Sequence, residues 1–164
     1  MTTPEEDADW FSKVSDVFAM IPDLYRVYGV KGDDSDVKVV PMSDQLPTGS
    51  VIGVLGYDGG SIIPGSWERQ EHTLDAAIWI PAPAGSLDKA YTLAVAYVDR
   101  VMAVFPGHGQ AGGVGVSGIQ SVLVTGFDQI ESREWADKEG EREYVVLPFT
   151  LEVTRSVARR YAAA

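Results

Sequence analysis

The chain has 164 residues, of which 24 are acidic, 13 are basic and 45% are apolar, a composition that suits one folded domain and excludes a disordered chain. The formal net charge of −11 excludes a general nucleic-acid binder, because contacts to phosphates need clustered lysine and arginine side chains. There is no cysteine, no apolar run long enough to span a membrane and no secretory signal at the acidic N-terminus, so we expect no disulfide, no thiolate chemistry, no membrane contact and synthesis inside the cell.

The first element is expected to be an amphipathic helix. Thr3 suits the N-cap, Pro4 suits the first helical position, and Glu6 completes a capping box. Apolar side chains then recur at helical spacing as far as Pro22, which predicts one helix of about 18 residues. These side chains are Trp10, Phe11, Val14, Val17, Phe18 and Ile21. We expect this face to join the core, and a groove on a partner protein is the alternative.

The next stretch alternates between loop and strand patterns. Residues 29–49 are rich in glycine, aspartate, serine and proline and are expected to form a loop, with at most a short strand at 37–40. The run from Ser50 to Tyr57 predicts a short buried strand. Residues 58–61 have the composition of a turn, which we expect to end that strand.

A longer strand and a second helix are expected in the middle of the chain. Between 67 and 80 the residues alternate, so that Leu74, Ala76, Ile78 and Ile80 share one face while Glu71, Thr73 and Asp75 share the other. Ser86 then suits the N-cap of a helix over 87–105. Its broad apolar stripe comprises Leu87, Tyr91, Leu93, Ala94, Val95, Val98, Val101, Met102 and Phe105.

The C-terminal third predicts a long hairpin. A strand is expected over 119–130, a charged connection with a projecting tip over 131–143, and an alternating strand over 144–154. The order of elements predicts a single α+β domain over 1–164, a mostly antiparallel sheet with the N-terminal helix and one long central helix packed on it. Residues 154–164 form a basic tail that carries Arg155, Arg159 and Arg160 and no acid.

No motif in the chain indicates catalysis. Gly107 to Gly112 matches G-x-G-x-x-G, but a helix precedes these glycines and a strand follows them, which is the reverse of a dinucleotide site. We expect a loop at 107–118 that becomes ordered against a neighbour. The two histidines, His72 and His108, have no companion residues at the spacing of a zinc site. We therefore expect a protein that is not an enzyme and has no cofactor or metal.

The candidates for contacts with other subunits are aromatic, basic and glycine residues in the predicted loops, at the start of the strand over 67–80 and in the basic tail. Trp135 stands out because it lies in a strongly charged stretch, and tryptophan with arginine is typical of interface anchors. The alternative is that Trp135 folds back onto the edge of the core. The full set of candidate interface residues is Gly59, Trp67, Arg69, His108, Gly112, Arg133, Trp135, Lys138, Arg159 and Arg160.

The layout of the chain resembles that of tail-terminator (tail-completion) proteins of long-tailed bacteriophages. The resemblance covers about residues 8–154 and rests on the order of elements and on three stretches: the helix ending at Ile21-Pro22, the strand around Trp67-Glu68-Arg69 and 72–79, and the closing strand 144–153. The glycine loop and the basic tail have no match in this pattern.

This resemblance implies a structural protein of the virion, made in the host cytoplasm. Such proteins form a hexameric ring that caps the tail tube and joins it to the neck or head connector, while DNA only passes through the ring. We expect the segments 58–66, 107–118 and 131–141 to make the contacts between subunits and between rings. The alternatives are another neck or tail component (a head–tail connector, a stopper or a tube protein) and a small ligand-binding α+β domain.

Overall fold

The computed structural model describes residues 3–22, 24, 26–28, 51–63, 67–82, 86–105, 119–137 and 140–158. Its elements in chain order are α1 (Pro4–Asp7), α2 (Asp9–Phe18), β1 (Arg26–Tyr28), β2 (Ile52–Ile63), β3 (Trp67–Pro81), α3 (Leu87–Val104), β4 (Ile119–Phe127), β5 (Glu131–Asp137) and β6 (Gly140–Ala158). The predicted α+β class is confirmed. The strand considered at 37–40 and the glycine loop at 107–118 lie outside the described residues.

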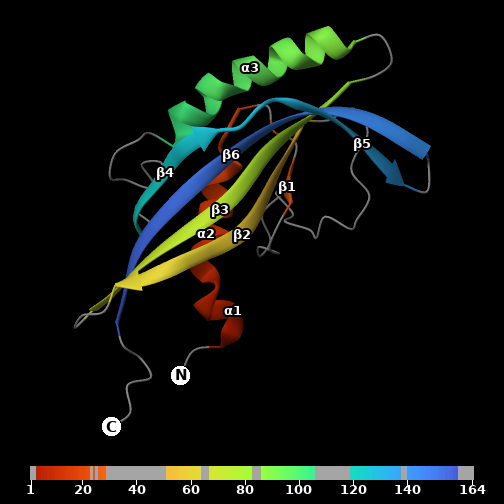
Figure 1. The fold of residues 1–164 in the computed structure, drawn as a ribbon. Coiled ribbons are helices and arrows are strands. Elements are labelled where there is room, and N and C mark those ends of the chain that lie inside the picture. The colour runs from red at the N-terminus through yellow and green to blue at the C-terminus, as the bar shows by residue number, and fades with distance from the viewer. Residues whose placement is uncertain are drawn as a thin grey trace.

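The sheet is built around its two longest strands, β3 and β6. The strand order is β1-β2-β3-β6-β4, and β5 pairs with the N-terminal part of β6 (Figure 1). All neighbours are antiparallel except β1 and β2, which are parallel over three residue pairs. The short strand β1 was not predicted, because three residues carry too little periodicity to be recognised.

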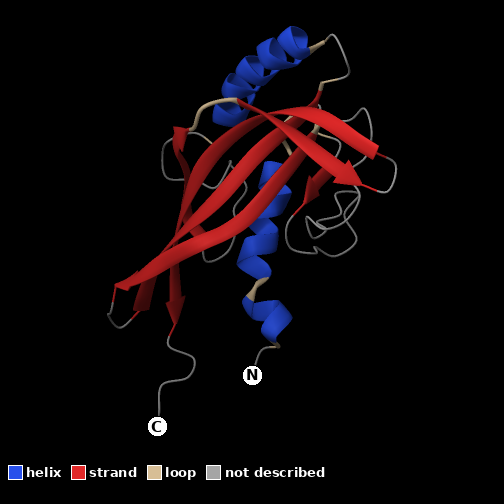
Figure 2. Cartoon of the chain, turned by 45° about the vertical axis from the view of Figure 1, so that its right-hand side comes forward, coloured by secondary structure: helices blue, strands red, loops and turns tan. Residues whose placement is uncertain are grey.

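Both longer helices pack on one face of the sheet, which we name the helical face (Figures 1 and 2). The alternation predicted for β3 and β6 is confirmed, because the apolar residues of both strands lie together in the core beneath α2 and α3. The buried residues of this core include Leu74, Ala76, Ile78, Ile80, Val145, Leu147, Phe149, Leu151 and Val153. A smaller buried cluster of Ile52, Trp79, Tyr144 and Val146 lies on the opposite face.

The N-terminal helix is interrupted, contrary to the prediction of one continuous helix. The capping box does form: the Thr3 hydroxyl accepts a hydrogen bond from the Glu6 backbone N–H at 3.2 Å, and a Glu6 carboxylate oxygen accepts one from the Thr3 N–H at 3.3 Å. Ala8 then leaves the helical conformation, with φ −92° and ψ 3°, and separates α1 from α2. Because α1 has no large apolar side chain, no burial against the sheet would be gained by continuing α2 straight into α1.

The turn predicted at residues 58–61 is wrong, because β2 continues through it to Ile63. The pairing of Gly60 with His72 and of Ser61 with Glu71 extends the β2–β3 ladder. A β-bulge between Tyr57 and Gly59 accommodates Asp58, and Gly59 has a φ of +121°. The turn-forming residues are therefore used for a bulge inside a strand, where the long partner strand β3 overrides the local preference.

The charged segment predicted as a connection is also a strand. Residues 131–137 form β5, which pairs with the start of β6 from Glu131↔Val146 to Asp137↔Gly140. The expected strand over 119–130 ends as β4 at Phe127, and residues 128–130 separate it from β5. Side chains of β5 from Glu131 to Glu134 are exposed, which explains why no apolar alternation revealed this strand.

The central helix α3 ends one residue before the predicted 105, and only three of the nine residues of its predicted apolar stripe are buried. Ser86 occupies the N-cap position, although its side chain makes no capping hydrogen bond. The side chains that enter the core are Ala90, Ala94, Tyr97 and Val101, followed by Phe105 after the helix. Leu87, Tyr91, Leu93, Val95 and Met102 remain exposed. Hydrophobic periodicity identified the helix but did not distinguish its buried side from its exposed flanks.

Candidate functional site

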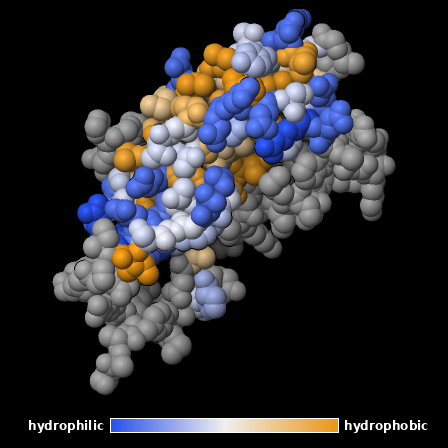
Figure 3. All heavy atoms as spheres, in the orientation of Figure 1, coloured by the Kyte–Doolittle hydropathy of each residue, from blue (hydrophilic) through white to orange (hydrophobic). Residues whose placement is uncertain are grey.

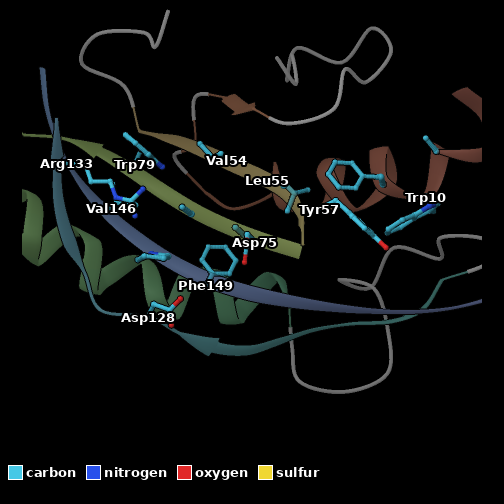
Figure 4. Close-up of a pocket in the computed structure, with 16 residues that line it drawn as sticks. Trp10, Val54, Leu55, Tyr57, Asp75, Trp79, Asp128, Arg133, Val146 and Phe149 are labelled. Atoms are coloured by element: carbon cyan, nitrogen blue, oxygen red, sulfur yellow. The ribbon is translucent and has the colours of Figure 1, made fainter. Parts of the chain in front are cut away.

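An open pocket of about 780 Å³ lies where β2, β3 and β6 meet the start of α2 (Figure 4). Its lining comes from five separate parts of the chain: Ala8 to Phe11, Val54 to Tyr57, Asp75 to Trp79, Asp128 with Arg133, and Val146 to Phe149. Side chains from the sheet face opposite the helices form much of it, and it extends to Trp10 and Tyr57 at the edge of β2. Only the tertiary fold brings these segments together.

The floor of the pocket is apolar and made of small or flat side chains. Val54, Ala77 and Pro148 occupy adjacent positions on three neighbouring strands, since Val54 pairs with Ala77 and Ala77 pairs with Pro148. Gly56 lies in the next row and adds no side chain. A floor of this kind leaves room above the sheet for an apolar group.

One end of the pocket is closed by an aromatic and a cationic side chain. The Arg133 guanidinium lies 6.0 Å from the centre of the Trp79 ring, a cation–π arrangement. The Arg133 Nε donates a hydrogen bond to a carboxylate oxygen of Glu131 at 3.0 Å. Arg133 was predicted as an interface residue, and the structure places it at this pocket.

The other side of the pocket carries acidic groups. Asp75 and Asp128 line it, and Asp58 makes a side-chain hydrogen bond with Asp75. Burial, and then the neighbouring charges of Asp58 and Asp128, raise the pKa of Asp75 above its usual 3.8. Among the described residues no three potential ligands have the arrangement needed to hold a metal ion. These carboxylates add negative charge to the lining of a pocket that also contains Arg133.

A second cluster fixes α2 to the sheet beside the pocket. The Trp10 indole stacks on the His72 imidazole with ring centres 4.5 Å apart, and the Arg155 guanidinium lies 5.1 Å from the Trp10 ring. His72 Nε2 donates to the Gln70 side-chain oxygen at 2.9 Å, so its Nδ1 accepts from the Tyr57 hydroxyl at 2.9 Å. In the neutral imidazole this arrangement gives both ring nitrogens a hydrogen-bond partner.

Protonation of His72 is expected to reduce the stability of the folded protein as the pH drops below about 6.5, the usual pKa of histidine. Burial and the nearby Arg155 lower the pKa of His72, so the unfolded chain binds more protons than the folded protein in this window. Thermal melting between pH 7.5 and 5 measures how steeply the melting temperature changes with pH. His72→Gln, which cannot titrate, is expected to weaken this dependence. If the melting temperature of His72→Gln depends on pH as strongly as that of the unmodified chain, other groups cause the loss of stability in acid.

The sheet has two edges without a partner strand among the described residues. β1 covers only Ile52–Val54 of β2, so the outer edge of β2 is open from Leu55 to Ile63. On the other side, β4 pairs only with β6. Since β2, β3, β6 and β4 alternate in direction, β2 and β4 run opposite ways. Within the described part of the chain, both edges therefore offer backbone groups to which another strand can add.

An apolar flank of α3 is a further exposed surface (Figure 3). Leu87, Tyr91, Val95 and Met102 follow one another at near-helical spacing, and Tyr91 and Val95 are each at least half exposed, at 52% and 50%. Charged side chains surround them. Nothing in the structure indicates what covers this flank.

The structure separates the predicted interface residues into two groups. Gly59, Trp67 and Arg69 lie toward the end of the sheet where β2 is joined to β3, and Arg69 contacts Glu71 at 3.7 Å. Arg133 and Trp135 lie in the hairpin of β5 and β6 at the opposite end (Figure 1). The side chains of Trp67 and Trp135 are not among those described. His108, Gly112, Lys138, Arg159 and Arg160 lie outside the described residues.

Sequence reasoning missed most of the pocket. Asp75 was predicted only to share a strand face with Glu71 and Thr73, and the structure places it in the lining of the pocket. Trp10 was expected on a face that joins the core or, as the alternative, binds a groove on a partner protein, and Trp79 was not singled out for any site. The spacing of these residues predicted which side of each helix or strand they occupy. It contained no information on which elements pack together to form the pocket.

Comparison of the sequence with models of known protein families gave no match, and a search among curated proteins also gave none. Among the described residues, no helix has the length and apolar character needed to cross a membrane.

Proposed function

We propose that this protein is a tail terminator of a long-tailed bacteriophage, a structural protein without enzymatic activity. Copies of the chain, made in the host cytoplasm, form a ring of six that caps the tail tube and joins it to the neck or head connector in the virion. The order of elements and the helix–sheet layout support this proposal, since they are the features in which the chain resembles that family.

The two sheet edges that have no partner strand among the described residues are the observation that carries the proposal. Strands β2 and β4 run in opposite directions, so β4 of one copy can add antiparallel to β2 of the next. Such a contact uses two different surfaces of the same chain. Repeated by rotation about one axis, a contact of this type closes into a ring with a fixed number of copies.

The two ends of the sheet differ, which suits a protein that must stop a tube. One end carries the β2–β3 hairpin with Arg69 and Glu71, and the other carries the β5–β6 hairpin with Glu131 and Arg133. In a ring the two rims would then have different surfaces. One rim binds the last ring of the tube, and the other binds the neck and recruits no further tube subunit.

The charge of the chain fits a ring through which DNA only passes. With a net charge of −11 the chain as a whole does not attract phosphates, although its basic tail carries three arginines. Acidic surfaces repel the DNA weakly and allow it to slide.

The native mass of the purified full chain tests the ring. One chain has a mass of 17.7 kDa, so a ring of six has a mass of 6 × 17.7, or about 106 kDa. Light scattering over a concentration series is expected to show one species of that mass that does not grow further. Open-ended growth would instead favour a tube protein.

A small ligand-binding domain is a second candidate, which the pocket favours. Its volume of about 780 Å³, apolar floor and opposed charged groups are features of sites for small molecules. A domain of that kind needs no assembly. A chain that stays monomeric both alone and with tail tubes would favour this candidate over the terminator, a connector or a stopper.

A further inference from the structure

The pocket has a chemical character that defines what it can accept. Its apolar floor of Val54, Ala77 and Pro148 accommodates small apolar groups. The acidic side, with Asp75 and Asp128 on the wall and Asp58 bonded to Asp75, calls for a cation. A guanidinium group suits this side best, because its planar fork can bind two carboxylate oxygens at once.

A cation would stabilise the carboxylates, because these negative groups are held close to one another. Asp58 lies beside Asp75, within side-chain hydrogen-bonding reach, so two acidic groups are held together at this side of the pocket. The raised pKa of Asp75 reflects burial first and then this neighbouring charge. A bound guanidinium offsets the repulsion between these neighbouring negative charges.

The chain itself contains a segment of matching chemistry. From Thr154 to Ala164 it carries three arginines and no acid, in a protein with a net charge of −11. Arg155 is already placed against Trp10. Arg159 and Arg160 are followed by Tyr161 and three alanines, small or flat apolar side chains that fit an apolar floor.

We propose that residues 159–164 of a second copy bind in this pocket. Arg159 and Arg160 of that copy contact the carboxylates of Asp75, Asp58 and Asp128. Tyr161 and the alanines lie on the floor of Val54, Ala77 and Pro148. The pocket is thus a docking site between copies of the chain, and the inference does not rest on the ring or on its role in a tail.

The geometry of β6 excludes the chain's own tail as the occupant. Ala158 pairs with Trp67 at the end of the ladder, whereas Asp75 pairs with Thr150. These levels are 158 − 150 = 8 residues apart, which is roughly 26 Å along a strand. Arg160 is two residues beyond Ala158, a reach of at most about 7 Å of backbone. The remaining gap is far longer than an arginine side chain.

Peptide binding tests the proposal directly. The receptor is the full chain carrying Arg159→Ser and Arg160→Ser, so that its own tails do not compete. The probe is a fluorescein-labelled peptide of residues 154–164, titrated by fluorescence anisotropy at low ionic strength. We expect saturable binding that weakens as salt is added, because salt screens the contacts between charges.

Two pairs of receptor variants locate the binding site. Asp75→Asn with Asp128→Asn is expected to weaken peptide binding at least tenfold. Asp88→Asn with Asp99→Asn makes the same change of charge on the exposed side of α3, away from the pocket, and is expected to leave the affinity unchanged. Circular dichroism checks that each receptor is folded.

Two results would overturn the proposal. One is equal affinity of the pocket variant and the α3 variant for the peptide. The other is a signal no greater than that of a peptide with serine at 159 and 160, which includes no binding at all. A chain that binds the peptide through the pocket but forms no ring would refute the proposed ring and leave this inference standing.

Discussion

Gly53→Ala is expected to destabilise the protein by about 3 kcal/mol, the upper end of the usual range for an overpacked core. A β-carbon at position 53 would lie only 2.0 Å from a ring carbon of Phe18. Phe18 cannot move aside easily, because it is fully buried and stacks on Phe149 with ring centres 5.6 Å apart. The added methyl group therefore pushes α2 away from the sheet.

Thermal unfolding followed by circular dichroism measures this effect, with an expected drop of roughly 10 °C in the midpoint. Gly126→Ala is the matched control, because a β-carbon there meets no atom within 4 Å. That substitution removes the same glycine freedom and is expected to be neutral or slightly stabilising. Equal effects of the two substitutions would contradict the close contact between Gly53 and Phe18.

A second substitution separates overpacking from a general weakness of β2. Phe18→Leu should relieve part of the clash, so the double variant is expected to lose less stability than the two single variants added together. Strict additivity would show that residues 18 and 53 act independently, against the packing of α2 on the helical face.

Placing two lysines on the open edge of β2 is expected to prevent the ring from closing. Ser61→Lys with Ile62→Lys introduces charges where the next copy would add its strand, and edge lysines are a common device against strand pairing. Both side chains are exposed, Ile62 at 60%, so the fold of each copy should persist. We expect at least a tenfold loss of affinity at each contact, about 1.4 kcal/mol.

The control places the same charges elsewhere. Ala96→Lys with Ala103→Lys lies on the exposed side of α3, and both variants change the net charge from −11 to −11 + 2 = −9. Light scattering should show smaller species for the edge variant alone. If both variants assemble like the unmodified chain, the edge of β2 is not the contact.

The faces of the long strands could be predicted from the sequence, because alternation over many residues leaves little freedom. Leu74 to Ile80 and Val145 to Val153 each present one continuous apolar row, and both rows lie in the core beneath the helices. The capping box of Thr3 and Glu6 was equally predictable, since it depends only on residues three apart.

Local patterns failed where a distant strand decided the outcome. Asp58 to Ser61 have the composition of a turn, but pairing with Glu71 to Thr73 keeps them in β2 and leaves one residue for the bulge. Glu131 to Glu134 show no apolar alternation, because these side chains of β5 are exposed. The strand is held in the sheet by backbone pairing with β6.

The pocket depended on contacts that no local pattern contains. Trp10, Asp75 and Arg133 are far apart in the sequence and come from a helix and two strands. Arg133 was selected because it lies beside Trp135 in a strongly charged stretch, whereas its contact Trp79 belongs to a strand that was recognised only by its alternation. Contacts between such distant residues follow from the order and register of the strands, which could not be predicted from the sequence alone.

The most direct test of the proposed role is electron microscopy of tail tubes assembling from the tube protein of the same phage, with and without this chain. A tail terminator is expected to appear as one ring at a single end of each tube and to stop elongation there. The edge variant, Ser61→Lys with Ile62→Lys, should leave tubes growing. Tubes that keep elongating with the unmodified chain present, or that incorporate it along their length, would contradict the account.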